Sequence, residues 1–370
     1  MVCHKDDKKN QEIQYLEYIC IKVASMKIKF VLLSTILALS SNSNAQIGGK
    51  RNFAFLNMPA SSRQVALGSN FISTPDNDIS MSWNNPAALN KSMHNHAFAS
   101  YNNYVSDING GYFSYARNIG KKGTLSANVL YLDYGQFDGY TPNGIYTGTF
   151  KAQDQCFALS YGTSFKEKFR LGASLKYAYS IYESYVSNAI SSDLSAIYTD
   201  SASQLNVTAY ARNIGYQTIA FNGSERVGLP FELAVSVSKR LAHLPFRYHL
   251  IFNNLQKPDM RYTITETNQK DENGNTKFQE MTMGDNILRH LALGGELNFS
   301  KHFVIRFGYN HMKRKELTQE QRRGTSGFSW GLGFRIKKFH LSYGSASYFP
   351  GFNSNQFSLL LNLNEFYSKK

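Results

Sequence analysis

Cysteine is nearly absent from this sequence, which holds only Cys3, Cys20 and Cys156 in 370 residues. Cys3 and Cys20 lie before the cleavage position proposed below, so the processed chain would keep Cys156 alone. A lone cysteine can form no internal disulfide. A fold stapled by disulfides is therefore excluded.

The sequence also lacks an apolar run of the roughly 20 residues that a membrane-spanning helix needs. Residues 30–39 form a shorter run, which follows the basic start Met26-Lys27-Ile28-Lys29 and precedes Ser43-Asn44-Ala45. A basic start, a short apolar core and small residues at a cleavage position are typical of a secretory signal peptide. We therefore interpret 26–45 as the signal, and the charged segment 1–25 upstream as a start codon placed too early.

Catalytic and metal-binding patterns are missing as well. The sequence has no His-Glu-x-x-His, no Gly-x-Ser-x-Gly and no phosphate-binding loop, and His302, His311 and His340 fall on separate predicted strands and loops. His94 and His96 would share one side of a strand, but two ligands without a third are too few for a metal. We predict no enzymatic activity, no cofactor and no metal.

The sequence has fewer acidic residues, 26 Asp and Glu, than basic ones, 40 Lys and Arg. Removal of residues 1–45 takes away four acidic and six basic residues, which leaves a formal charge of +12. The basic residues are scattered over turns, loops and strand positions, which argues against nucleic acid as a partner. One interpretation is turn lysines plus lumen arginines. The other is attraction to lipopolysaccharide phosphates, carried best by one long loop with Lys313, Arg314, Lys315, Arg322 and Arg323.

From about residue 95 onward, apolar and polar residues alternate with a period of two. In one such stretch, Leu171, Ala173, Leu175 and Tyr177 oppose Gly172, Ser174 and Lys176. A soluble β-sandwich also alternates in this way. A barrel wall with lipid outside and a polar lumen inside alternates likewise.

The lengths of the connections favour the membrane barrel over the sandwich. We predict about fourteen antiparallel strands, and an even number is typical of bacterial barrels. Every second connection is a tight turn, such as Lys166-Glu167 or Lys337-Lys338, whereas 135–153, 213–229, 255–287 and 313–325 are long. Long loops at one end only are typical of outer-membrane barrels. We place the barrel over 95–370 and its strands at 96–105, 109–118, 123–134, 154–164, 168–182, 189–199, 204–212, 230–240, 245–254, 288–299, 302–312, 326–337, 338–347 and 355–366.

Residues 46–94, between the signal and the barrel, are predicted as a small plug of helix and turn. In Trp83-Asn84-Asn85-Pro86-Ala87, Pro86 fixes its own φ, and the amides of Asn84 and Asn85 can bond local backbone groups in a tight turn. This run, together with Ser62-Arg63-Gln64-Val65-Ala66-Leu67-Gly68 and the acids Asp76 and Asp78, resembles the N-terminal region of barrels related to the FadL fatty-acid transporter. The resemblance implies a lumen closed by an N-terminal plug, with Asn84, Asn85, Pro86 and Ala87 as its structural turn.

Within that group, the sequence is most similar to outer-membrane barrels of the type IX secretion system. The similarity rests on the run from Asn52 to Gly68, on Tyr115-Ala116-Arg117-Asn118-Ile119-Gly120, on Leu229-Pro230-Phe231 and on Leu241-Ala242-His243-Leu244-Pro245-Phe246-Arg247. It implies membership of an attachment complex, anchoring a PorZ-like surface protein beside a PorU-like sortase and a PorV-like barrel. The alternative, from the FadL likeness, is a transporter of hydrophobic small molecules.

The topology predicts which segments a surface partner can reach. If the short turns face the periplasm, the long segments 255–287 and 313–325 face the cell surface. Lys257-Pro258-Asp259-Met260-Arg261-Tyr262 is expected to continue the ninth strand, and Asp271-Glu272-Asn273-Gly274-Asn275 to turn it into a hairpin. The candidate partner-binding residues are Met260, Arg261, Tyr262, Lys313, Arg314, Lys315, Arg322 and Arg323, which otherwise only shield the barrel mouth.

The signal peptide gives the first testable prediction. N-terminal sequencing of protein purified from outer membranes should return a chain beginning at Gln46, because the small residues Ser43, Asn44 and Ala45 precede it. A mature terminus upstream of Met26 would refute the signal-peptide interpretation.

Overall fold

The computed structural model describes residues 51–68, 73–223, 225–261, 264–270, 276–279, 282–317, 324–349 and 352–367. The predicted signal peptide 26–45, the upstream segment 1–25 and the predicted mature terminus Gln46 lie outside the described residues. All elements below belong to the compact unit Gln46–Lys370.

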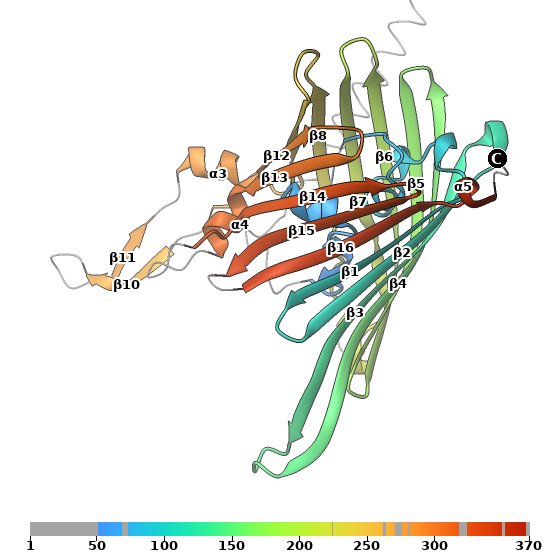
Figure 1. Ribbon diagram of the computed structural model, residues 1–370. Helices are drawn as coiled ribbons and strands as arrows, with labels where there is room; N and C mark the ends of the chain where they lie inside the picture. The colour runs from blue at the N-terminus through green and yellow to red at the C-terminus, as the bar shows by residue number, and fades with distance from the viewer. Residues whose placement is uncertain are drawn as a thin grey trace, which may run out of the picture. The chain divides into compact units, whose positions relative to one another are not determined.

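Fourteen antiparallel strands close into a barrel, as the sequence predicts (Figure 1). Closure occurs where the first strand pairs with the last, with His96 opposite Asn362 and Asn103 opposite Asn355. Closure removes both sheet edges, which would otherwise offer unpaired backbone groups to other chains. The barrel strands are β1 (His96–Val105), β2 (Ile108–Asn118), β3 (Thr124–Tyr140), β4 (Tyr146–Lys166), β5 (Phe169–Tyr182), β6 (Tyr185–Asp200), β7 (Leu205–Ile219), β8 (Glu232–Arg240), β9 (Phe246–Phe252), β12 (Leu291–Asn298), β13 (Phe303–Asn310), β14 (Phe328–Ile336), β15 (Phe339–Phe349) and β16 (Phe352–Asn362).

The alternation of the sequence sorts side chains between the two faces of the wall. On β5, Leu171, Leu175 and Tyr177 are exposed on the outside, whereas Ser174 and Lys176 are buried inside. The same division repeats around the barrel and gives an outer band of apolar side chains around a polar interior, the arrangement of membrane barrels. None of the described helices is both long and apolar enough to cross a membrane.

The long connections leave one end of the barrel, as predicted, although that end also has the tight turns 106–107 and 183–184. Two of the expected long loops are, however, partly strand. β3 and β4 continue through most of 135–153 and leave only residues 141–145 between them, and β7 runs on to Ile219. In β3 and β4 the register shifts between Asp133 and Gln136, where Gly135 has a φ of 86°. This bulge interrupts the period of two and hides the outer part of both strands from the sequence pattern.

The predicted hairpin within 255–287 exists, but it does not continue the ninth strand. β9 ends at Phe252, and Asn254, with a φ of 57°, turns the chain away. The hairpin is a separate pair, β10 (Ile264–Lys270) and β11 (Thr276–Gln279), whose turn residues 271–275 lie outside the described residues. Two short helices, α3 (Met283–Arg289) and α4 (His311–Glu316), complete this end, and α5 (Asn364–Tyr367) follows β16.

Five short helices form the plug: η1 (Ala54–Asn57), α2 (Ser62–Ala66), η2 (Ile79–Trp83), η3 (Pro86–Ala88) and η4 (Lys91–Met93). Capping side chains fix where three of them begin. Ser61 accepts a hydrogen bond from the Gln64 amide, Asp78 from that of Ser80 and Asn90 from that of Ser92. Such caps satisfy amides at a helix start that have no partner within the helix. The predicted plug of helix and turn is therefore present.

The plug crosses the lumen from wall to wall. Helix α2 lies against β13, β14, β15 and β16, and η3 lies against β4, β5 and β6. Wall glycines allow this close approach: a Cβ on Gly172 would overlap the backbone of Pro86 and Ala87, and one on Gly344 would overlap that of Ser62. The plug backbone thus rests directly on the wall at two well-separated places.

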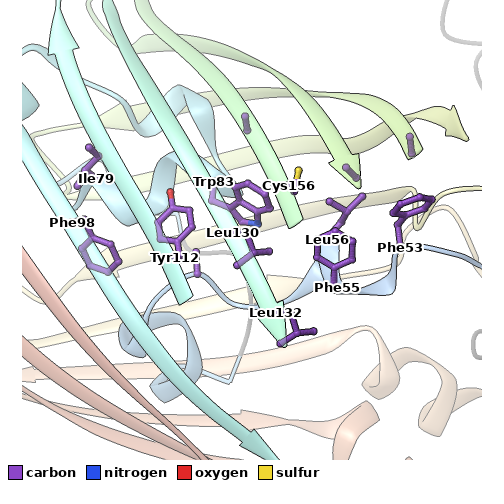
Figure 2. Close-up of a cluster of buried hydrophobic side chains, with 14 of the residues drawn as sticks. Phe53, Phe55, Leu56, Ile79, Trp83, Phe98, Tyr112, Leu130, Leu132 and Cys156 are labelled. Atoms are coloured by element: carbon purple, nitrogen blue, oxygen red, sulfur yellow. The ribbon is translucent and has the colours of Figure 1, made fainter. Parts of the chain in front are cut away.

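Apolar side chains fill part of the space between plug and wall. Figure 2 shows Trp83 from the plug beside Tyr112 and Leu130 of the wall, with Phe55 and Leu56 farther along the same cluster. The Trp83 and Tyr112 rings meet edge to face with centroids 5.7 Å apart. Trp83 and Leu56 are fully buried. This hydrophobic cluster therefore lies inside the barrel and is built from plug and wall residues together.

The glycine contacts predict a sharp difference between two substitutions. Gly172→Val should prevent the plug from seating, because the new side chain needs the space of the Pro86 and Ala87 backbone. Gly111→Val is the matched control, since a Cβ there has only one atom within 4 Å, the Ser100 carbonyl oxygen at 3.7 Å. We expect Gly172→Val to lower the free energy of unfolding by at least about 1–3 kcal/mol, and Gly111→Val to leave it unchanged. The temperature at which the band shifts on gels of heated samples compares the two variants. Equal behaviour of the two variants would contradict the plug position.

Candidate functional site

One buried carboxylate joins the plug to the wall. Glu296 on β12 points inward and accepts hydrogen bonds from Arg63 of the plug, Nε to Oε1 at 2.8 Å and Nη2 to Oε2 at 2.8 Å. Arg306 of β13 also donates to Oε1 at 2.9 Å, and His249 of β9 lies 3.3 Å from Oε2. Two-pronged pairing of a guanidinium and a carboxylate is strong and directional. It sets the orientation of α2 in the lumen.

Plug acids complete the surroundings of Arg63. Its Nη1 lies 2.7 Å from Asp76 and 3.4 Å from Asp78. Burial by itself would lower the pKa of Arg63, but the charges of Asp76, Glu296 and Asp78 outweigh burial and hold that pKa well above its usual value. Arg63 is thus permanently charged, and its contact with the wall does not respond to physiological pH.

A polar cavity of ≈ 240 Å³ remains beside this cluster, between the plug and the wall. Arg63, Arg247 and Arg306 line it together with Glu296, Asp76 and Asp78. Three cations and three anions balance, so the cavity has no net preference for a charged occupant. The cavity belongs to the contact between plug and wall and does not by itself indicate a ligand.

A second contact holds the predicted plug turn. The Lys176 Nζ of β5 lies 4.4 Å from the centre of the Trp83 ring and 2.6 Å from Asp193 Oδ2 of β6. Both Lys176 and Asp193 are 1% exposed. A buried charge is tolerated only when it is paired, and here the pair also binds the aromatic face of the plug.

The four predicted turn residues all contact the wall or are buried beside it. Asn84 Oδ1 accepts a hydrogen bond from Arg212 Nη1 at 2.7 Å, and Arg212 in turn pairs with Glu232. The Ala87 amide donates to Ser195 Oγ at 2.8 Å, and Pro86 opens η3.

Asn85 differs from the sequence prediction. We expected its amide to bond local backbone groups, but neither its oxygen nor its nitrogen has a hydrogen bond within the described part of the chain, although Asn85 is 1% exposed. The neighbouring Ala87 bonds the wall at Ser195 and lies against Gly172. The tight turn is thus shaped by tertiary contacts more than by its own amides.

The candidate partner-binding residues are less uniform than the sequence suggests. Met260 is 1% exposed and its amide donates to Asn286 Oδ1, so its side chain is not at the surface. This corrects the prediction, because Asn286 of α3 bonds both the Met260 amide and the Pro258 carbonyl and holds the segment against that helix. Arg261 is exposed and pairs with Asp259 at 2.7 Å. Tyr262 lies outside the described residues.

The second candidate loop is partly ordered by α4. Lys313 Nζ lies 5.0 Å from the centre of the Tyr348 ring, and Arg314 lies over Phe328 and donates to the Gly324 carbonyl. Of the three basic residues on α4, only Lys315 is exposed. Arg322 and Arg323 lie outside the described residues. The structure thus leaves Arg261 and Lys315 as accessible candidates.

An ion cluster ties the two long loops together at this end. Asp285 of α3 lies 2.9 Å from Arg289, 3.1 Å from His311 and 3.4 Å from Lys315. Burial alone would raise the pKa of the Asp285 carboxyl, but hydrogen bonds from His311 and Arg289 and the charges of Lys315 and Arg289 outweigh it and hold the pKa below its usual value. Because α3 and α4 come from different loops, the cluster makes this part of the rim one unit.

No group of three or more His, Cys, Asp or Glu side chains among the described residues is arranged to hold a metal ion. His94, one of the two histidines weighed as ligands, accepts a hydrogen bond at Nδ1 from the Asn118 amide at 3.2 Å. Its ring therefore takes part in the start of the barrel wall.

Neither a protein-family model nor a curated protein matches this sequence. Among solved structures, the toluene transporter TbuX of Ralstonia pickettii is similar at a TM-score of 0.51 and 11% identity, over 83% of this chain and 98% of that one. The toluene transporter TodX of Pseudomonas putida matches at 0.48 and 11%, over 82% and 96%, and a FadL homologue of Pseudomonas aeruginosa at 0.46 and 10%, over 82% and 98%. At this identity, the likeness to TbuX shows the fold alone: that of a Gram-negative outer-membrane barrel.

The buried Lys176–Asp193 pair gives a stability prediction. Lys176→Met leaves Asp193 buried without its cation and should lower the free energy of unfolding by about 3–5 kcal/mol. The double variant Lys176→Met with Asp193→Asn should recover most of this loss, because asparagine still accepts from the Asn213 amide that now bonds Asp193. Urea unfolding in detergent measures both. A double variant as unstable as the single one would contradict the pairing.

Proposed function

We propose that this chain is a non-enzymatic outer-membrane barrel that works as an anchor, in the manner of PorQ in the type IX attachment complex. In this proposal it holds a PorZ-like surface protein at the outer membrane, beside a PorU-like sortase and a PorV-like barrel. The observation that carries the proposal is the plug that crosses the lumen and pairs with the wall through buried charges. The sequence resemblance supplies the identity of the partners.

A fixed plug suits an anchor better than a conduit. To move α2 away from the wall, Arg63 must leave Glu296, and breaking one buried ion pair costs about 3–5 kcal/mol. The η3 turn would also have to leave Ser195, Arg170 and Arg212, each of which contacts it or the residues beside it. These contacts favour a barrel whose lumen stays filled.

The alternative is a FadL-like transporter of hydrophobic small molecules. The similar structure of TbuX is that of a toluene transporter, and that activity belongs to TbuX. The apolar cluster around Trp83 is occupied by plug side chains. Transport therefore requires the plug to move, which makes the two functions separable by experiment.

The same proposal includes the location and the remaining partners. The protein would reside in the outer membrane of a Gram-negative cell after signal-peptide cleavage, with lipid around its apolar band and lipopolysaccharide around its long-loop end. Lys315 and Arg261 are exposed there, each also close to an acid of the chain, Asp285 and Asp259 respectively, and exposed cations at this end would attract anionic groups. Nucleic acid is not among the proposed partners.

Removal of the whole chain tests the anchoring function. In a cell that lacks the chain, the PorZ-like surface protein should move from the outer membrane to the medium, as measured by immunoblot of both fractions. Uptake of a hydrophobic small molecule should not change. Retention of the surface protein together with a loss of uptake would replace anchoring by transport.

A plug locked to the wall provides a second arm. Ala87→Cys with Ser195→Cys places two thiols where the plug amide now meets the wall hydroxyl, and the periplasm is oxidising enough to join them. An anchor should keep its surface partner with the lock closed, whereas a transporter should lose uptake and regain it on reduction. The Ala87→Cys single variant is the control.

A further inference from the structure

The hairpin between β3 and β4 extends far beyond the neighbouring strands (Figure 1). β3 has 17 residues and β4 has 21, whereas a strand crosses the bilayer in about 9 to 11 residues. At the short-turn end β3 begins and β4 ends, so the extra length of both strands lies at the long-loop end. We call residues 135–151 the ribbon.

Apart from the Glu183 amide, which donates to the Lys151 carbonyl, the strand pairing of the ribbon in the described chain is within the ribbon itself. The ladder between β2 and β3 ends at Asn109 and Asp133, and the ladder between β4 and β5 ends at Ala152 and Tyr182. Beyond these pairs, Gln136 lies opposite Lys151 and Tyr140 opposite Tyr146, and none of the other described strands pairs with either side. Both outer edges of the ribbon therefore carry free backbone donors and acceptors at strand spacing.

Four large apolar side chains of the ribbon are exposed. Phe137 is 42% exposed, Tyr140 61%, Ile145 65% and Tyr146 55%. The rings of Phe137 and Phe150 stack with centroids 5.4 Å apart, and those of Tyr140 and Tyr146 meet at 5.6 Å. Counted from the short-turn end, the ribbon lies beyond the roughly 9 to 11 residues that cross the bilayer, so lipid tails would not cover these side chains. An exposed aromatic patch in water marks a contact site.

The charge of the ribbon favours a protein over lipopolysaccharide as its occupant. Residues 135–151 hold one acid, Asp138, and one base, Lys151, in a chain with a formal charge of +14. A patch for lipid phosphates would need surplus cations. Free strand edges recognise another extended backbone, and exposed tyrosine and phenylalanine are the residue types enriched in protein interfaces.

We propose that the ribbon is the principal docking site for the surface partner. The partner presents an extended segment that pairs with a free edge of the ribbon, together with an apolar face that covers Phe137, Tyr140, Ile145 and Tyr146. This inference rests on the proposed anchoring function. It places the main contact on β3 and β4, away from the loops 255–287 and 313–325.

Two variants of the full-length barrel test the docking site. In the first, an Asn-Gly turn replaces residues 137–150 and joins the paired residues Gln136 and Lys151. In the second, Tyr140→Ser and Tyr146→Ser remove only the edge-to-face pair. The control is Leu244→Ser with Phe299→Ser, two comparably exposed apolar residues at the short-turn end. Heat-shifted migration on gels verifies that each barrel is folded.

Binding of the purified surface partner to each barrel in nanodiscs is the measurement. Loss of two interface hot spots of ordinary size weakens binding by roughly 100-fold or more, and we expect this for both ribbon variants and no change for the control. Undiminished partner binding by the folded ribbon variants would overturn the docking site. So would an effect confined to binding of lipopolysaccharide vesicles, or an equal loss in the control.

The failures of the two proposals are distinguishable. If deletion of the whole chain releases the surface partner but the shortened ribbon retains it, the docking site is wrong and anchoring stands. If the partner stays in the outer membrane without the chain, anchoring itself fails. A third barrel that lacks β10 and β11 should bind the partner normally. If this barrel loses the partner while the ribbon variants keep it, the contact lies in 255–287.

Discussion

The buried carboxylate of Glu296 is the point on which the interior of this protein depends. It lies on the wall, but the guanidinium that grips it with two hydrogen bonds belongs to the plug, more than two hundred residues earlier in the chain. A carboxylate in such a place is tolerable only when it is paired. Arg306 of the wall pairs with the same carboxylate, so the wall supplies part of this pairing and Arg63 adds the two hydrogen bonds that orient the plug.

The same dependence explains the pattern of small residues inside the barrel. At Gly172 and Gly344 the plug backbone comes so close that a side chain on the wall has no room. Trp83 then covers the Lys176–Asp193 pair and Asn84 reaches Arg212. Charged pairs fix the position of the plug, the apolar cluster around Trp83 contributes the burial, and the glycines allow both to act at short range. Together they favour a lumen that stays filled, which supports the proposed anchoring function over the transport of small molecules.

The strands of the barrel differ in length, and the two ends of the barrel therefore differ in structure. At the short-turn end the connections are tight, and at the other end α3 and α4 are joined by the Asp285 cluster while β3 and β4 run on beyond the bilayer. Where β3 and β4 extend past the bilayer, lipid no longer covers their side chains and neighbouring strands no longer pair with their backbone. Their apolar side chains and free backbone then become available to a protein, which connects the fold to the proposed attachment role.

The sequence by itself determined the barrel, because the period of two is local: each residue such as Leu175 or Lys176 is assigned to a face by its immediate neighbours. For the same reason it determined the fourteen strands, the alternation of short and long connections and the existence of a plug around Trp83 and Pro86. It could not show that Met260 is buried, that β3 and β4 continue past the bulge at Gly135, or that Arg63 pairs with Glu296. The Arg63–Glu296 pair and the burial of Met260 depend on contacts between residues well separated in the chain, which only the folded barrel brings together. The outer part of β3 and β4 escapes the pattern for another reason, since the bulge at Gly135 interrupts the period of two.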